Sequence, residues 1–308
     1  AYEPIWAIGT GYTATAEPTY GTATVYFTFV ADGGDGQYIF TYTRKDTGET
    51  VDTHTLYVDT EYTLDMSKMT ADEQAKLLND IVKYAGSGTI AVKWDDTAKA
   101  LNYKGTRNGN PVSHLYFPVY ASGDAYVFEA EIGFVSGAST WSTMAFAAEG
   151  FVEHLQSAFW GTLSKTGTGA EFVRFQDPAV YGDNWAVGHV NVPFTTVLDA
   201  LGDKWSDTYT YNAEKDTYSV TDTVTFKVIV YEDTMYGFVD GAQVLAVPNN
   251  GSLCKDLNGV FGFNSGGSSL NIHSLSVRPI TEENEDEELD GVDMAFNPSK
   301  SFNNDIYE

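Results

Sequence analysis

Residues 224–247 contain the pattern that most limits how this chain can fold. Apolar residues alternate with other residues in three successive short runs. The alternating positions are Phe226, Val228 and Val230, then Tyr236 and Phe238, then Val244 and Ala246. A period of two is typical of strands that bury one face. The segment therefore predicts three strands of a sheet that covers a core.

Two short turns separate these runs, at Glu232-Asp233 and at Asp240-Gly241. Asp-Gly between alternating runs is a strong hairpin signal, because the favoured two-residue turn needs positive φ at both central residues. A Gly-rich run at 259–263 and an alternating run at 270–277 follow. We expect five consecutive strands in this part of the chain.

The order of these runs resembles one known family. A strand ending in V-D-G at 239–241 is followed by G-V-F-G-F at 259–263 and N-I-H-S-L-S-V at 271–277. Upstream, 126–134 and 141–146 look like the early strands of the same fold. Over roughly residues 100–280 the chain resembles the concanavalin A-like (laminin G-like) jelly-roll superfamily. The resemblance implies a mainly β fold with a jelly-roll sandwich. It leaves function open, because this superfamily includes lectins, adhesion modules, hydrolases and spacers.

The sequence divides into four expected segments. They are an N-terminal arm at 1–18, a small α+β unit at 19–98, the jelly-roll sandwich at 99–280 and an acidic tail at 281–308.

The α+β unit is expected to hold strands at 24–30, 37–43, 54–58 and 89–94. A turn at 31–36 would join the first two strands as a hairpin. Thr70 and Glu73 have the spacing of a capping box, which predicts a helix over about 70–85 that ends at Gly86. This order fits a β-grasp-like unit, and it equally fits a decorated edge of the sandwich.

The N-terminal segment is unusual. Residues 1–17 resemble the catalytic-loop segment of triosephosphate isomerase, in which the position of Glu3 is the catalytic base. Tyr12 stands where that family usually has Lys, and no alternating βα units follow. We therefore do not expect isomerase activity.

Composition excludes several classes of function. The formal net charge is −26, which argues against binding to nucleic acids or anionic membranes. Cys254 is the one cysteine, so no disulfide can form within the chain. No apolar run reaches the roughly 18 residues of a membrane-spanning helix. The acidity and the low cysteine content favour a bacterial protein that is extracellular or on the cell surface.

The tail at 281–308 has ten acidic residues and one lysine. Such a run is normally a solvated linker or tail. Apolar residues from Met294 onward also allow it to dock on the body of the protein or on a neighbouring subunit.

Aromatic residues next to polar ones suggest a sugar-binding site. Sugars stack on exposed aromatic rings, and Asp or Asn side chains bind their hydroxyl groups. The candidate ligand-binding residues are Trp185, Asp183, Asn184 and Tyr181 in one loop, together with Trp160 in an expected strand.

The sequence leaves two further kinds of chemistry open. Calcium is the one cofactor left open, with oxygens from Asp183 and Asn184 or from the loop at 32–36. Glu129 and Glu131 lie two apart in a strand, so they share a face and could form the acid pair of a glycoside hydrolase. The five histidines lie in no known catalytic motif.

Three functions are consistent with the sequence. The first is a non-catalytic carbohydrate-binding or adhesion module whose partner is a glycan or polysaccharide. The second is a structural subunit of a surface layer or filament that self-associates through 1–18 or 281–308. The third is a jelly-roll glycoside hydrolase.

Overall fold

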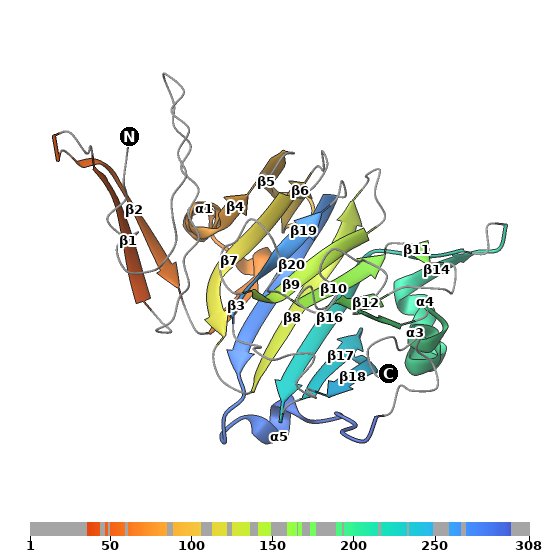
Figure 1. The fold of residues 1–308 in the computed structure, drawn as a ribbon. Helices are drawn as coiled ribbons and strands as arrows, with labels where there is room; N and C mark the ends of the chain where they lie inside the picture. The colour runs from red at the N-terminus through yellow and green to blue at the C-terminus, as the bar shows by residue number, and fades with distance from the viewer. Residues whose placement is uncertain are drawn as a thin grey trace.

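The architecture consists of two large antiparallel sheets packed face to face (Figure 1). The computed structural model describes residues 36–43, 47–48, 50–58, 61–84, 89–105, 113–121, 125–135, 141–148, 159–164, 166–167, 173–176, 189–192, 194–214, 217–232, 234–248, 259–265 and 269–296. All strand pairs within these residues are antiparallel. The mainly β jelly-roll sandwich expected from the sequence is confirmed.

One sheet has eight strands, and its central strands are β8 and β20. In spatial order its strands are β18 (Ala242–Pro248), β17 (Thr234–Val239), β16 (Thr223–Tyr231), β8 (Tyr126–Val135), β20 (Ser269–Pro279), β6 (Ala100–Gly105) and β5 (Ile90–Asp95), with β3 (Tyr62–Asp65) also paired to β20.

The facing sheet has seven strands. In spatial order they are β13 (His189–Val192), β12 (Val173–Gln176), β10 (Phe159–Ser164), β9 (Trp141–Ala148), β19 (Gly259–Ser265), β7 (Ser113–Ala121) and β4 (Val82–Tyr84). Two smaller sheets complete the β structure of the described residues. They are the hairpin of β1 (Gly36–Thr43) and β2 (Thr50–Val58), and a sheet of β11 (Thr166–Gly167), β15 (Thr217–Val220) and β14 (Tyr209–Asn212).

The two predicted turns are confirmed. Tyr231 pairs with Thr234, and Val239 pairs with Ala242, so each connection has two residues. Asp240 and Gly241 have φ values of 49° and 77°, as the favoured two-residue turn requires. The Asp240 carboxylate also accepts a hydrogen bond of 2.8 Å from the Thr225 amide, which fixes this turn against β16.

Aromatic side chains from both sheets fill the space between them. Phe261 of β19 stacks on Phe128 of β8 with ring centroids 5.0 Å apart, and Tyr126 meets Phe261 edge-on at 5.6 Å. All three side chains are buried. Burying each such side chain contributes about 1.5–3 kcal/mol, so these contacts hold the sheets together.

The helix predicted after Thr70 forms, but it is shorter than expected. Helix α1 spans Ala71–Asp80, and both capping-box hydrogen bonds are present. The prediction of a helix to residue 85 is wrong, because Val82–Tyr84 instead forms β4 and pairs with the edge of β7. β-branched and aromatic residues favour such a strand once a sheet edge is available. Strands β3 and β5 pair with β20 and β6, so residues 62–95 contribute to both large sheets.

Three short helices among the described residues were not predicted. They are α3 (Phe194–Leu201), α4 (Trp205–Thr208) and α5 (Glu285–Glu288). A usable signal existed for α3, because Pro193 precedes it and Gly202, with φ of 57°, follows it. None of the described helices is long and apolar enough to cross a lipid bilayer.

Residues 280–296, the C-terminal segment, pack on the outer face of the eight-stranded sheet. Four apolar side chains of this segment contact an apolar patch on that face, namely Ile280, Leu289, Val292 and Phe296. The patch consists of Val127, Ile229, Tyr236, Phe238 and Ala246. Figure 1 shows α5 of this segment beyond the ends of β16 and β20. This part of the acidic tail is docked on the body of its own chain.

Polar contacts reinforce this docking. Arg278 Nη2 donates to Glu288 Oε2 at 2.7 Å, and Tyr231 Oη donates to Glu285 Oε1 at 2.5 Å. The side-chain amide of Gln243 donates to the Asp293 carbonyl at 3.1 Å and accepts from the Asp293 amide at 2.8 Å. The acidic residues of this segment therefore include specific anchors.

The isomerase-like segment at 1–17 and the strand expected at 24–30 lie outside the described residues. The strand expected at 37–43 forms, and its partner is β2.

Candidate functional site

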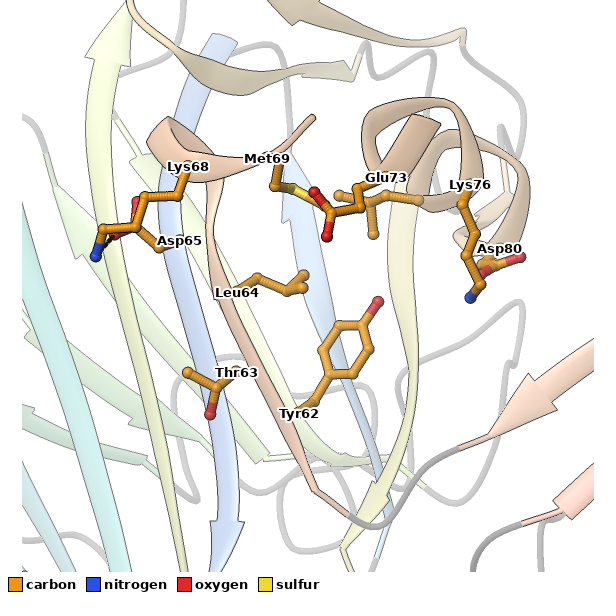
Figure 2. A pocket seen from close by; sticks show the side chains of 10 residues that line it. Tyr62, Thr63, Leu64, Asp65, Lys68, Met69, Glu73, Lys76 and Asp80 are labelled. Atoms are coloured by element: carbon orange, nitrogen blue, oxygen red, sulfur yellow. Dashed lines mark hydrogen bonds and ion pairs between the residues drawn. The ribbon is translucent and has the colours of Figure 1, made fainter. Parts of the chain in front are cut away.

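A pocket of about 300 Å³ lies beneath helix α1, between this helix and strand β3 (Figure 2). We call it the α1 pocket. The side chains that line it include one aromatic ring, three carboxylates and two lysines. The lining residues are Tyr62, Thr63, Leu64, Asp65, Lys68, Met69, Glu73, Lys76, Leu77 and Asp80.

Local sequence explains how the helical side of the pocket forms. Asp65 begins the 3₁₀ turn η2 (Met66–Lys68), where its carboxylate accepts from the Ser67 amide at 3.0 Å. Thr70 then begins α1, and its amide donates to Glu73 Oε2 at 2.7 Å. The Thr70 hydroxyl donates to the same oxygen at 2.8 Å. These caps hold the carboxylates of Asp65 and Glu73 at the helix starts, where positive helix ends favour negative charge.

The apolar wall of the pocket continues into the sandwich core. Leu77 is buried, and Tyr62, Leu64 and Met69 are half-buried against the same core. The Tyr62 ring meets Phe117 of the facing sheet at a centroid distance of 6.3 Å. Figure 2 shows the Tyr62 hydroxyl and the Glu73 carboxylate pointing into the space below α1. The ring is therefore anchored by the core while its polar end reaches the pocket.

The charged groups form local pairs. Lys68 Nζ lies 2.7 Å from Asp65 Oδ2, and Lys76 Nζ lies 2.5 Å from Asp80 Oδ2 (Figure 2). Surface ion pairs of this kind contribute little to stability, so their main effect here is to place charge around the pocket.

Hydrogen bonds keep two of the carboxylates ionised. The hydrogen bonds from Lys68 and then Ser67 lower the pKa of Asp65 to about 2. Hydrogen bonds from the amide and hydroxyl of Thr70 lower the pKa of Glu73. The bond to Asp65 raises the pKa of Lys68. At neutral pH the pocket therefore presents these groups in their charged forms.

The ligand-binding residues predicted from the sequence are not brought together by any described contact. Four of the five lie outside the described residues, namely Tyr181, Asp183, Asn184 and Trp185. Trp160 lies in β10, where it pairs with Gln176 of β12 and Ala145 of β9. These five residues remain a prediction.

Sequence reasoning missed the α1 pocket. The Thr70-Glu73 capping box was visible and correctly interpreted as a helix start. Strand β3 was not predicted, because four residues are too few for a clear alternating pattern. The alternation of Tyr62 and Leu64 with polar neighbours was the available signal.

One member of the carboxylate pair on β8, Glu129, belongs to an ion cluster. Glu129 Oε2 lies 3.5 Å from Arg278 Nη2, and the same guanidinium also binds Glu288. Glu131 pairs with Ser274 of β20 on one side and with Thr225 of β16 on the other. Glu129 thus helps to tie the sheet to the C-terminal segment.

Calcium also remains a prediction, because the loops at 32–35 and 183–184 are outside the described residues. Within the described part of the chain, no three His, Cys, Asp or Glu side chains form a group that could hold a metal ion.

Comparisons with known proteins find likeness in fold alone. No family model and no curated relative matches the chain. A carbohydrate-binding module, CBM66 from Bacillus subtilis, is 12% identical with a TM-score of 0.38, over 62% of this chain and 94% of that one. A Bacillus subtilis protein with a galectin-like fold is 11% identical with a TM-score of 0.40, over 71% and 94%. The alginate lyase from a Corynebacterium species is 9% identical with a TM-score of 0.38, over 60% and 79%. With TM-scores below 0.5, these likenesses carry no argument about the site of this chain.

Proposed function

We propose that this protein is a carbohydrate-binding module that holds a glycan without cleaving it, and that the α1 pocket receives one sugar residue. The observation that carries the proposal is that the Tyr62 ring and the carboxylates of Glu73 and Asp80 line the same pocket of about 300 Å³. Pockets for small ligands begin at about this volume. Such a pocket suits a single sugar ring better than a long oligosaccharide.

The chemistry of the lining supports a sugar. The C–H face of a sugar ring packs well on an aromatic ring such as that of Tyr62, whose position is fixed by Phe117. Carboxylates accept hydrogen bonds from sugar hydroxyls, and charge-assisted bonds of this kind are stronger than neutral ones. The pocket therefore offers both an apolar surface and strong acceptors.

The same lining favours binding over hydrolysis. A glycoside hydrolase needs one carboxylic acid with a raised pKa that protonates the leaving group. In the α1 pocket, hydrogen bonds lower the pKa of Asp65 and of Glu73, and Asp80 is paired with Lys76. Glu129 of the β8 pair is engaged with Arg278.

We further propose that the loop at 176–186, with Trp185 and Asp183, makes a second contact with a longer glycan. The aromatic and polar composition of this loop supports the proposal. The acidic, cysteine-poor composition supports a location outside the cell, where a glycan or polysaccharide partner would be met.

A glycan array with neutral, acidic and amine-bearing glycans tests the proposed function. We expect retention of at least one glycan class, and no release of reducing ends when that glycan is incubated with the protein. Binding to no glycan would contradict the proposal. Release of reducing ends would instead make the protein a hydrolase.

A further inference from the structure

The charges of the α1 pocket point to the class of sugar that it accepts. We propose that the pocket binds a sugar with a free amino group and excludes uronic acids. This inference rests on the proposed function, since it names the ligand class of the same pocket.

Both lysines of the pocket are already neutralised by neighbouring carboxylates. Lys68 is held by Asp65, and Lys76 is held by Asp80. A uronic acid carboxylate would have to compete with these local partners for its counter-charge. An anionic sugar could therefore bind a lysine of the pocket only by displacing the carboxylate that already pairs with it.

Glu73 differs from the other two carboxylates. Its carboxylate accepts hydrogen bonds from the neutral amide and hydroxyl of Thr70. None of the ion pairs among the described residues includes Glu73. Three carboxylates and two ammonium groups thus leave one negative charge at the pocket. Glu73 is the carboxylate that a ligand ammonium group would neutralise.

Tyr62 adds a second attraction for the same group. Its ring lies in the pocket below Glu73, and an ammonium group is drawn to the face of an aromatic ring. The formal net charge of −26 also raises the local concentration of cationic ligands and lowers that of anionic ones.

Titration calorimetry with three ligands tests this inference. The ligands are glucosamine oligomers, N-acetylglucosamine oligomers of the same length and uronate oligomers. We expect the glucosamine oligomer to bind at least about tenfold more tightly than its acetylated counterpart, because a charge-assisted hydrogen bond is about twice as strong as a neutral one. The uronate oligomer is expected not to bind. The preference for the free amine should weaken as salt is added.

Glu73→Gln isolates the charge. Glutamine also serves in a capping box, so helix α1 and the pocket wall are retained while one negative charge is lost. We expect this variant to lose the tenfold preference. Glu283→Gln makes the same charge change on an exposed residue of the C-terminal segment and should keep the preference.

The outcomes separate this inference from the proposed function. Equal binding of the free and acetylated oligomers would overturn the inference and leave carbohydrate binding standing. A preference that survives Glu73→Gln would also overturn it, because the ammonium group would then bind elsewhere. Binding of none of the three oligomers would overturn this inference, whereas binding of no glycan on the array would overturn the proposed function itself.

Discussion

Gly262→Ala is expected to lower the free energy of unfolding by about 3 kcal/mol or more. Gly262 lies in β19, opposite Tyr116 of β7. A Cβ atom at this position would lie 2.1 Å from the Leu115 carbonyl oxygen and 2.9 Å from Tyr116 Cδ1. The first of these contacts is with backbone, which cannot move without breaking the pairing of β19 and β7. Urea denaturation followed by tryptophan fluorescence measures the loss.

Gly133→Ala is the matched control in the other sheet. A Cβ atom there would come no closer than 3.2 Å, to Nε2 of the His273 side chain. The His273 ring can shift, so we expect Gly133→Ala to lower the free energy of unfolding by less than about 1 kcal/mol. Replacing glycine also lowers the entropy of the unfolded chain, which offsets part of this loss. Equal stability of the two alanine variants would contradict the packing described between β19 and β7.

Deletion of residues 281–308 is expected to lower the free energy of unfolding by about 3–5 kcal/mol and to cause self-association. The deletion removes Leu289, Val292 and Phe296 from the apolar patch around Ile229 and Phe238. Burial of such side chains contributes about 1.5–3 kcal/mol each when it is complete. The newly exposed patch would favour contacts between molecules. Urea denaturation and light scattering at several concentrations measure the two effects.

A chain that ends at Phe296 is the control, because it keeps every described contact of the C-terminal segment. It should retain the stability of the full chain. If the segment were instead exchanged between neighbouring subunits, deletion of 281–308 would break an assembly into monomers. A full-length assembly that becomes monomeric on deletion would thus contradict intramolecular docking and support a structural subunit.

Short-range features of the fold could be predicted from the sequence. The dipeptide Asp240-Gly241 is enough to predict a two-residue turn, because few residues other than glycine and aspartate adopt the positive φ values that this turn requires. The capping box at Thr70 and Glu73 likewise acts within one helical turn. The period-two pattern at 224–247 predicted strands because one sheet face is buried.

Long-range features could not be predicted in this way. The end of α1 depends on the pairing of Val82 with Tyr116 of β7, which competes with further helix. The α1 pocket requires β3 to pair with β20, where Thr63 and Ser276 are 213 residues apart. No local pattern specifies such a pairing. The docking of the C-terminal segment was left open for the same reason, because its partners, such as Val127 and Tyr231, lie on strands far away in sequence.

Calorimetry on Tyr62→Ala, with the best glycan from the array as ligand, tests the central claim most directly. Tyr62→Phe serves as the control for the ring, and Trp185→Ala tests the loop at 176–186 separately. We predict that Tyr62→Ala weakens binding at least about tenfold, because the stacking surface is lost, while Tyr62→Phe keeps most of the affinity. Unchanged binding by Tyr62→Ala, together with loss of binding by Trp185→Ala, would contradict the account and move the site to the loop.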